Sequence, residues 1–179
     1  MQLTVDGFVG GLNGEMDWMK MNWGDDIKKY VGKLTDSVDT ILLGRKLADG
    51  FIPYWTSIKP DNPDYPFACN MLDKPKVVFT KTLEKHDWAN TSLAKGDVAE
   101  EVNKLKKQNG KSIIVYGGAS FVSSLIKNNL IDEYHLFVNP AAIGKGLTIF
   151  TKLEDKMNLK LVESKAFDCG IVVNHLEPK

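Results

Sequence analysis

The sequence predicts an α/β fold: a central, mainly parallel sheet flanked by helices, with a C-terminal antiparallel hairpin. Three short apolar runs rich in β-favouring residues, 40–43, 77–80 and 113–116, are the first reason. Such runs are typical of strands buried on both faces, as in a parallel sheet. The second reason is that longer amphipathic stretches separate these runs, which indicates βαβ crossovers. The third is that the strand patterns in the last third of the chain have no long helix between them.

Three segments have the periodicity of amphipathic helices. Residues 25–34 place Ile27, Tyr30 and Val31 on one face, and two acids stand in the first turn, where the helix dipole favours them. Residues 97–107 and 120–126 follow the same pattern. These helices would cover the faces of the sheet.

The last third of the chain carries three strand patterns, at 134–139, 159–166 and 171–176. Asp168-Cys169-Gly170 separates the last two and is typical of a hairpin connection. The sheet is therefore expected to be mixed, with antiparallel strands at its end.

Two segments read as irregular. Residues 6–24 hold five glycines and two tryptophans, and residues 50–66 hold four prolines among aromatic residues. Long loops of this composition are predicted either to close over a functional site or to plug the edge of the core.

Composition bounds the function. A length of 179 residues predicts a single domain over residues 1–179, and 23 basic against 23 acidic residues give no pull toward nucleic acid or a membrane surface. The two cysteines and three histidines lack metal-ligand spacing, so no metal site is expected. No apolar run approaches the ~20 residues that span a bilayer, and the protein is expected in the cytoplasm.

The strongest local motif is a predicted strand that runs through Gly117-Gly118 into a helix start at Ala119, Ser120 and Phe121. Free backbone N–H groups and the positive end of the helix dipole meet at such a turn, so it can hold a phosphate. The alternative is a tight turn that needs glycine for its backbone angles alone.

Two other predicted strands end in groups that suit a phosphate. Gly44, Arg45 and Lys46 follow the first, and Thr80 and Lys81 close the second. Ligands of open α/β sheets bind beyond the carboxyl ends of the strands, and arginine can grip a phosphate with two hydrogen bonds. Three such ends together predict an extended anionic ligand such as a dinucleotide.

In this order, these motifs resemble the dihydrofolate-reductase-like superfamily. The likeness is closest to the reductase domain of the bacterial riboflavin-biosynthesis enzyme and its stand-alone relatives, and it covers nearly the whole chain. It is carried by residues 3–10 and 14–18, by 42–46 and 115–118, and by 130–133, Pro140, 144–146 and Phe150.

The resemblance implies an NADPH-dependent reductase of a pterin-like or ribosylaminopyrimidine substrate, working as a homodimer. Gly117 and Gly118, with the helix start at 119–121, would hold the diphosphate. The loop residues Val9 and Gly10 would lie near the nicotinamide. The adenosine part of NADPH, with its 2′-phosphate, would be bound by Gly44, Arg45, Lys46, Thr80 and Lys81.

A hydride transfer to C=N or C=O needs a proton donor or a polarising acid. Asp26 stands roughly where the family has its acid, and Asp25 competes with it. Both could instead only stabilise the helix dipole. Trp18, Trp23 and Trp55 are candidates for an aromatic wall around a flat substrate, or for a plain hydrophobic lid.

Two other function classes stay open. Leu47 replaces the threonine that the family usually has two residues after the arginine, so the chain could bind NADPH without efficient catalysis. A flavodoxin-like FMN carrier would need a hydroxyl-rich phosphate loop, which residues 6–14 lack.

Overall fold

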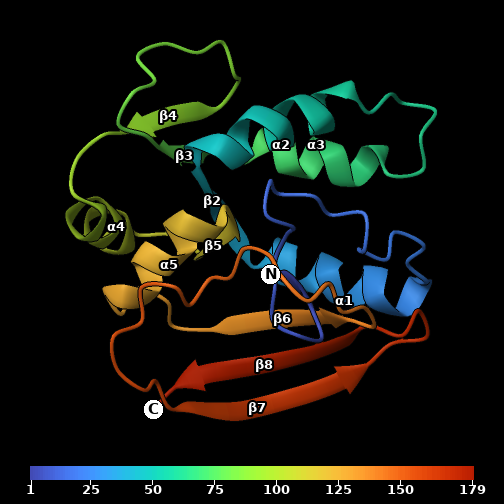
Figure 1. The fold of residues 1–179 in the computed structure, drawn as a ribbon. Helices are drawn as coiled ribbons and strands as arrows, with labels where there is room; N and C mark the ends of the chain where they lie inside the picture. The colour runs from blue at the N-terminus through green and yellow to red at the C-terminus, as the bar shows by residue number, and fades with distance from the viewer. The chain divides into compact units, whose positions relative to one another are not determined.

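The computed structural model describes residues 1–179 and separates into two compact units. We call Met1–Thr35 with Val122–Lys179 the terminal unit and Asp36–Phe121 the central unit. The single domain expected for residues 1–179 stays a prediction. In chain order the elements are β1 (Gln2–Thr4), α1 (Asp25–Asp36), β2 (Val38–Gly44), α2 (Arg45–Ser57), α3 (Tyr65–Asp73), β3 (Lys76–Phe79), β4 (Thr91–Ala94), α4 (Val98–Lys106), β5 (Ser112–Gly117), α5 (Ala119–Lys127), β6 (Tyr134–Asn139), β7 (Leu159–Ala166) and β8 (Val172–Pro178) (Figure 1).

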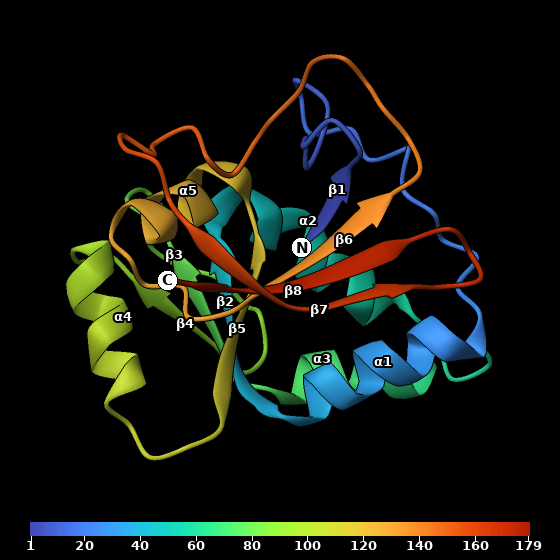
Figure 2. The ribbon, with the colours of Figure 1, turned by 90° about the horizontal axis from the view of Figure 1, so that it is seen from below.

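The central unit contains an entirely parallel sheet in the order β4-β3-β2-β5 (Figure 2). Ile41, Leu43 and Val78 are fully buried, and Leu42 on the opposite face is 3% exposed. The continuous apolar runs therefore mark strands covered on both sides, as predicted. Strand β4 escaped prediction because it has only four residues, two of them hydroxylated.

Helices α2 and α3 connect β2 to β3, and α4 leads from β4 back to β5. These two connections run in opposite directions along the sheet, so right-handed crossovers place their helices on opposite faces (Figure 1). The face under α2 and α3 holds a core cluster of six buried residues: Ile41, Leu43, Ala48, Ile52, Met71 and Val78.

The prediction of an irregular segment over residues 50–66 is wrong for its first part. Helix α2 runs from Arg45 to Ser57 with Pro53 inside it. Ala48 and Ile52 are buried on one side of this helix, and Trp55 packs against the same core cluster. The free energy gained by burying these apolar side chains outweighs the loss of the one backbone hydrogen bond that proline removes.

The terminal unit contains a mixed sheet in the order β1-β6-β8-β7. Strand β1 is parallel to β6, and β6-β8 and β8-β7 are antiparallel. The predicted hairpin between β7 and β8 is confirmed: Phe167 N–H donates to Ile171 O at 2.9 Å, and Gly170 turns the chain at a φ of 87°. The α/β class with a parallel sheet, flanking helices and a terminal hairpin is thus confirmed, with the strands divided between two sheets.

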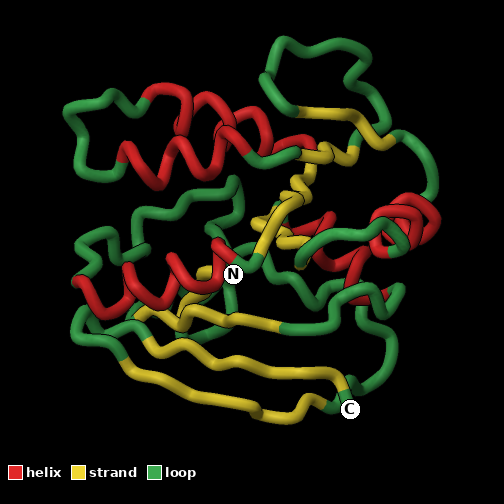
Figure 3. Tube along the Cα trace, turned by 180° about the vertical axis from the view of Figure 1, so that it is seen from behind, coloured by secondary structure: helices red, strands yellow, loops and turns green.

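Helix α1 packs in the terminal unit through Ile27, Val31 and Thr35, all buried. The ring of Tyr30 meets Phe137 and Phe167 edge-on, with centroids 6.1 and 5.5 Å apart. Residues 6–24 form neither helix nor regular strand, as predicted (Figure 3). None of the helices is long and apolar enough to cross a bilayer.

Candidate functional site

The carboxyl ends of the four parallel strands in the central unit lie in register along one edge of the sheet. Leu43 pairs with Gly117, Gly44 with Phe79, and Phe79 with Ala94. The predicted groups after β2, β3 and β5 therefore belong to one edge, which we call the carboxyl edge. This is where open α/β sheets bind their ligands.

At the centre of the carboxyl edge, β2 and the turn after β5 approach each other closely. A Cβ atom added to Gly44 would lie 3.2 Å from Gly118 N and 3.0 Å from Phe121 Cβ. Gly117 has a φ of 141°, a conformation that side chains rarely permit, and its peptide bond to Gly118 is cis. Gly44 is thus required because a side chain would collide with its neighbours, and Gly117 because of its φ.

Two helices begin at this edge without acidic residues in their first turns, α2 at Arg45 and α5 at Ala119. Gly44, which caps α2, offers no side-chain hydrogen bond to the helix start. The first N–H groups of a helix and its dipole favour an anion. By contrast, α4 is capped internally, since Asp97 accepts from Ala99 N and Glu100 N.

The positive charge at the carboxyl edge comes from Arg45, Lys46 and Lys81. Arg45 pairs with Asp49 one turn along α2, yet its Nε is buried and has no hydrogen-bond partner. Lys46 is exposed. Lys81 Nζ donates to the carbonyl oxygens of Lys95 and Gly96 at 2.9 Å each, which ties the ends of β3 and β4 together.

Thr80 is less accessible than its neighbours. It is 6% exposed, and its hydroxyl oxygen accepts from Thr82 N at 3.2 Å and Leu83 N at 3.0 Å. This hydroxyl therefore shapes the turn after β3. On the other side of the same strand end, the rings of Phe79 and Phe121 stack with centroids 4.5 Å apart.

An aromatic cluster lines the core of the central unit. Phe51 lies between Trp55 and Tyr116, at centroid distances of 6.0 and 5.2 Å. Trp55 Nε1 and the Tyr116 hydroxyl are both buried without a hydrogen-bond partner, and burial raises the pKa of Tyr116 above its usual range. Tyr116 was not predicted as a site residue, although it stands directly before Gly117.

The other predicted residues belong to the terminal unit. Val9 and Gly10 are held in extended form, because Val9 N donates to Leu147 O and Leu147 N to Gly10 O, both at 2.8 Å. Asp6 accepts from the N–H groups of Ile143 and Gly144 at 3.1 and 2.7 Å. The resemblance motifs near residues 3–10 and 144–146 therefore meet in space.

The loop that carries the tryptophans is fastened by a buried asparagine. Asn139 is fully buried, and its Oδ1 accepts from Lys20 N at 3.0 Å. Trp23 Nε1 donates to Lys20 O at 2.8 Å, and its ring stacks on Phe137. Trp18 Nε1 is buried and unpaired. Asn139 was missed by sequence reasoning, since nothing around it marks it as more than a strand end.

The two candidate acids differ in their surroundings. Asp25 is exposed, whereas Asp26 Oδ2 accepts from Asp168 N at 3.0 Å and Oδ1 from Ile27 N at 2.8 Å. The hydrogen bond from Asp168 is the main cause that lowers the pKa of Asp26. A lowered pKa suits a carboxylate that stays ionised and disfavours a general acid.

Replacing Asp26 by Asn tests this tether through pH. Because the folded state lowers the pKa from its ordinary value of 3.8, the carboxylate stabilises the fold above that pH and the gain disappears as the pH falls through the lowered value. In urea unfolding, the stability difference between wild type and Asp26→Asn is expected to shrink on acidification. Asp25→Asn serves as the matched control, because this exposed carboxylate does not receive the hydrogen bond from Asp168 N. Parallel pH profiles for wild type and Asp26→Asn would contradict the tether.

Comparisons with known proteins identify the family and the fold. The sequence model of the family described as "RibD C-terminal domain" matches residues 1–173. The uncharacterized protein YyaP of Bacillus subtilis strain 168 is 36% identical over 177 residues, covering 96% of this chain and 89% of its own length.

Two solved structures share the fold. The diaminohydroxyphosphoribosylaminopyrimidine deaminase/5-amino-6-(5-phosphoribosylamino)uracil reductase of Thermotoga maritima has a TM-score of 0.68 at 18% identity, with 99% of this chain matched to 55% of that one. Dihydrofolate reductase from Enterococcus faecalis, complexed with NADP(H) and RAB-propyl, has a TM-score of 0.64 at 13% identity, covering 99% and 93%.

Proposed function

Because the chain belongs to the RibD C-terminal domain family, we propose that it is an NADPH-dependent reductase acting on a small heterocycle of the pterin or ribosylaminopyrimidine class. The observation that carries the proposal is the carboxyl edge. Three features of the central unit meet there. Gly44 approaches Gly118 closely, α2 begins without a side-chain cap, and the buried Arg45 Nε makes no hydrogen bond. This fits a diphosphate with a cationic partner.

In this proposal the N–H groups at Gly118, Ala119 and Ser120 hold the diphosphate, beside Gly117 and Phe121. Gly44, Arg45, Lys46, Thr80 and Lys81 hold the adenosine side, and the cations favour NADPH over NADH. When bound, NADPH supplies the hydride. Val9 and Gly10 contact the nicotinamide ring. The heterocyclic substrate is bound by Trp18, Trp23 and Trp55.

Asp26, or Asp25, is the proposed acid. The lowered pKa of Asp26 suits an ionised carboxylate that polarises a protonated heterocycle better than one that donates a proton. The two structural neighbours, a 5-amino-6-(5-phosphoribosylamino)uracil reductase and a dihydrofolate reductase, support the reaction class.

Two further parts of the proposal concern the whole protein. We place it in the cytoplasm and expect a homodimer. Support for the dimer comes from β7, an edge strand on which Leu161 and Val162 are 56% and 45% exposed.

The test is a fluorescence titration with NADPH and with NADH. Arg45→Ala is expected to weaken NADPH binding about 10-fold, the value of one charge-assisted hydrogen bond, and to affect NADH less. Lys104→Ala is the matched control, because it removes one exposed cation from the outer side of α4. The proposal fails if neither nucleotide binds, or if Arg45→Ala binds NADPH as wild type does.

The alternative to a reductase is a protein of the same fold that binds NADPH with little or no catalysis. Leu47 and the hydrogen-bonded Asp26 favour it. A screen of pterin and ribosylaminopyrimidine substrates, in which NADPH oxidation is the readout, distinguishes the reductase from the non-catalytic binding protein. Turnover with any of them excludes the alternative.

A further inference from the structure

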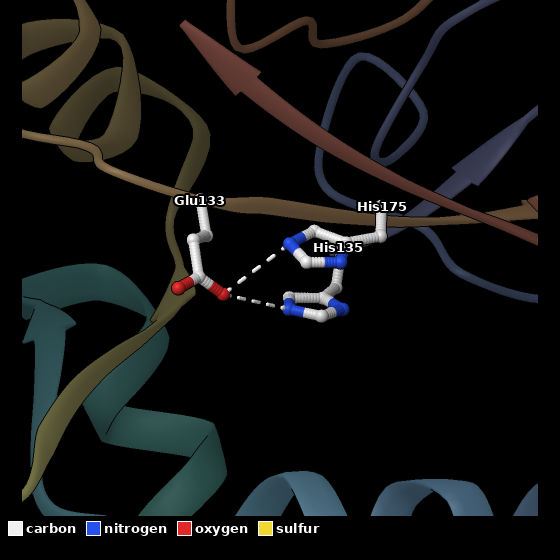
Figure 4. A group of neighbouring side chains, drawn as sticks. All are labelled: Glu133, His135 and His175. Carbon is white, nitrogen blue, oxygen red and sulfur yellow. Dashed lines mark hydrogen bonds and ion pairs between the residues drawn. The ribbon is translucent and has the colours of Figure 1, made fainter. Parts of the chain in front are cut away.

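Three titratable side chains outside the carboxyl edge meet on the sheet of the terminal unit. Glu133, His135 and His175 each direct one ligand atom into a common space, and these atoms lie within 4.8 Å of one another (Figure 4). His135 on β6 stands directly opposite His175 on β8 in the antiparallel ladder, and Glu133 precedes His135 by two residues. Directly paired residues of neighbouring strands share a face of the sheet, and the residue just before β6 brings Glu133 to the same two histidines.

The distances suit a metal better than direct hydrogen bonds. Nε2 of His135 lies 3.4 Å, and Nε2 of His175 3.3 Å, from the same oxygen of Glu133. A charge-assisted N–H···O⁻ bond is shorter, about 2.7–2.9 Å. Ligand bonds of about 2.0–2.1 Å in a tetrahedron separate neighbouring ligand atoms by roughly 3.3–3.4 Å. Nε2 of His175 is moreover buried and makes no hydrogen bond.

The hydrogen bonding of His135 also fits a ligand. Its Nδ1 lies 2.9 Å from the hydroxyl of Tyr30 on α1, so this ring can donate there and leave the Nε2 lone pair free. Metal-binding histidines usually have such a partner on their second nitrogen. The two rings lie nearly parallel, with centroids 4.3 Å apart at an interplanar angle of 16°. Because an imidazole nitrogen binds a metal in the plane of its ring, one of the two rings must turn for both Nε2 atoms to reach the same ion. Glu163 on β7 pairs with His175 in the ladder and adds negative charge to the same face.

We infer that Glu133, His135 and His175 form a binding site for a divalent transition metal, with Zn²⁺ as the best-suited ion. Two imidazoles and one carboxylate are a known zinc donor set, and three protein ligands leave a fourth position open to water or a small ligand. The site shares no residue with the proposed nucleotide site and does not rest on the proposed reductase function.

The test uses the full chain without a histidine tag, freed of metal by a chelator. Zn²⁺ affinity is measured by competition with a chromophoric chelator, and coordination is followed by the visible absorption of added Co²⁺. Wild type is expected to bind one equivalent of either ion, with the intense Co²⁺ absorption of a four-coordinate site. Zn²⁺ should also raise the melting temperature, since only the folded protein brings the three ligands together.

Variants identify the ligands. Glu133→Gln and His175→Ala each remove a direct ligand and are expected to weaken Zn²⁺ binding by about 100-fold; the Glu133 side chain is 59% exposed, so its substitution should not disturb the fold. Tyr30→Phe removes the hydroxyl that contacts His135 and is expected to weaken binding by about 10-fold. His86→Ala is the matched control, because His86 is the third of the chain's three histidines and lies outside the cluster. Cys69→Ser/Cys169→Ser is the control for thiol binding.

The inference is overturned if wild type binds neither ion, if Glu133→Gln binds as wild type does, or if either control abolishes binding. Glu133→Gln decides the question even where His175→Ala fails to fold. NADPH titration of the metal-free protein keeps the two proposals apart, because loss of the metal should leave nucleotide affinity unchanged.

Discussion

Gly44→Ala is expected to lower the free energy of unfolding by about 1–3 kcal/mol, the usual cost of overpacking, and to weaken NADPH binding at least about 100-fold. Gly44 has a φ of −73°, which any residue can adopt, so the effect is steric. The new Cβ would meet Gly118 N at 3.2 Å and Phe121 Cβ at 3.0 Å, atoms that cannot swing aside as a side-chain end would. Either β2 or the start of α5 must move, and the proposed diphosphate contacts move with it.

Urea unfolding measures the first effect and fluorescence titration the second. Gly50→Ala is the matched control in the same helical region, because a Cβ there meets nothing within 4 Å. In the interior of α2 alanine should stabilise by about 0.5–1 kcal/mol. If Gly44→Ala behaved like Gly50→Ala, the close approach at the carboxyl edge would be disproved.

Asn139→Leu is expected to lower the free energy of unfolding by about 2–4 kcal/mol, because it removes three hydrogen bonds and leaves the buried Phe137 O without this donor, which costs about 1–3 kcal/mol. Leucine fills a similar volume, so little of this loss comes from a cavity. Besides accepting from Lys20 N, Asn139 donates to Gln2 Oε1 at 2.8 Å and to Phe137 O at 3.1 Å. Without it the loop over residues 5–24 loses the hydrogen bond that ties Lys20 N to β6.

Hydrogen exchange of the Lys20 amide gives the local readout and should become markedly faster. Asn128→Leu is the control, since this exposed asparagine makes one side-chain hydrogen bond, to Ser124 O at 2.8 Å. Its substitution should change stability by less than about 0.5 kcal/mol. Equal stabilities for the two variants would show that Asn139 does not anchor the loop.

Local patterns predicted much of the fold. The buried parallel strands, the helix starts at Asp25 and near Ala119, and the hairpin at 168–170 all follow from neighbours in sequence, because periodicity and turn chemistry are local. The same reasoning failed over residues 50–57. There the prolines and aromatic residues suggested a loop. The helix is stabilised by the packing of Ile52 and Trp55 in the core of the central unit, which no local pattern shows.

The sequence by itself determined the α/β class, the family and the row of phosphate-compatible groups that follow β2, β3 and β5. Only the tertiary structure decided which distant residues meet. His135 and His175 stand 40 positions apart and look unrelated until the β6-β8 register sets them face to face. Asn139 and Lys20 are joined in the same way across 119 positions. Strand register and loop attachment depend on the free energy of the whole packed unit, which no local pattern contains.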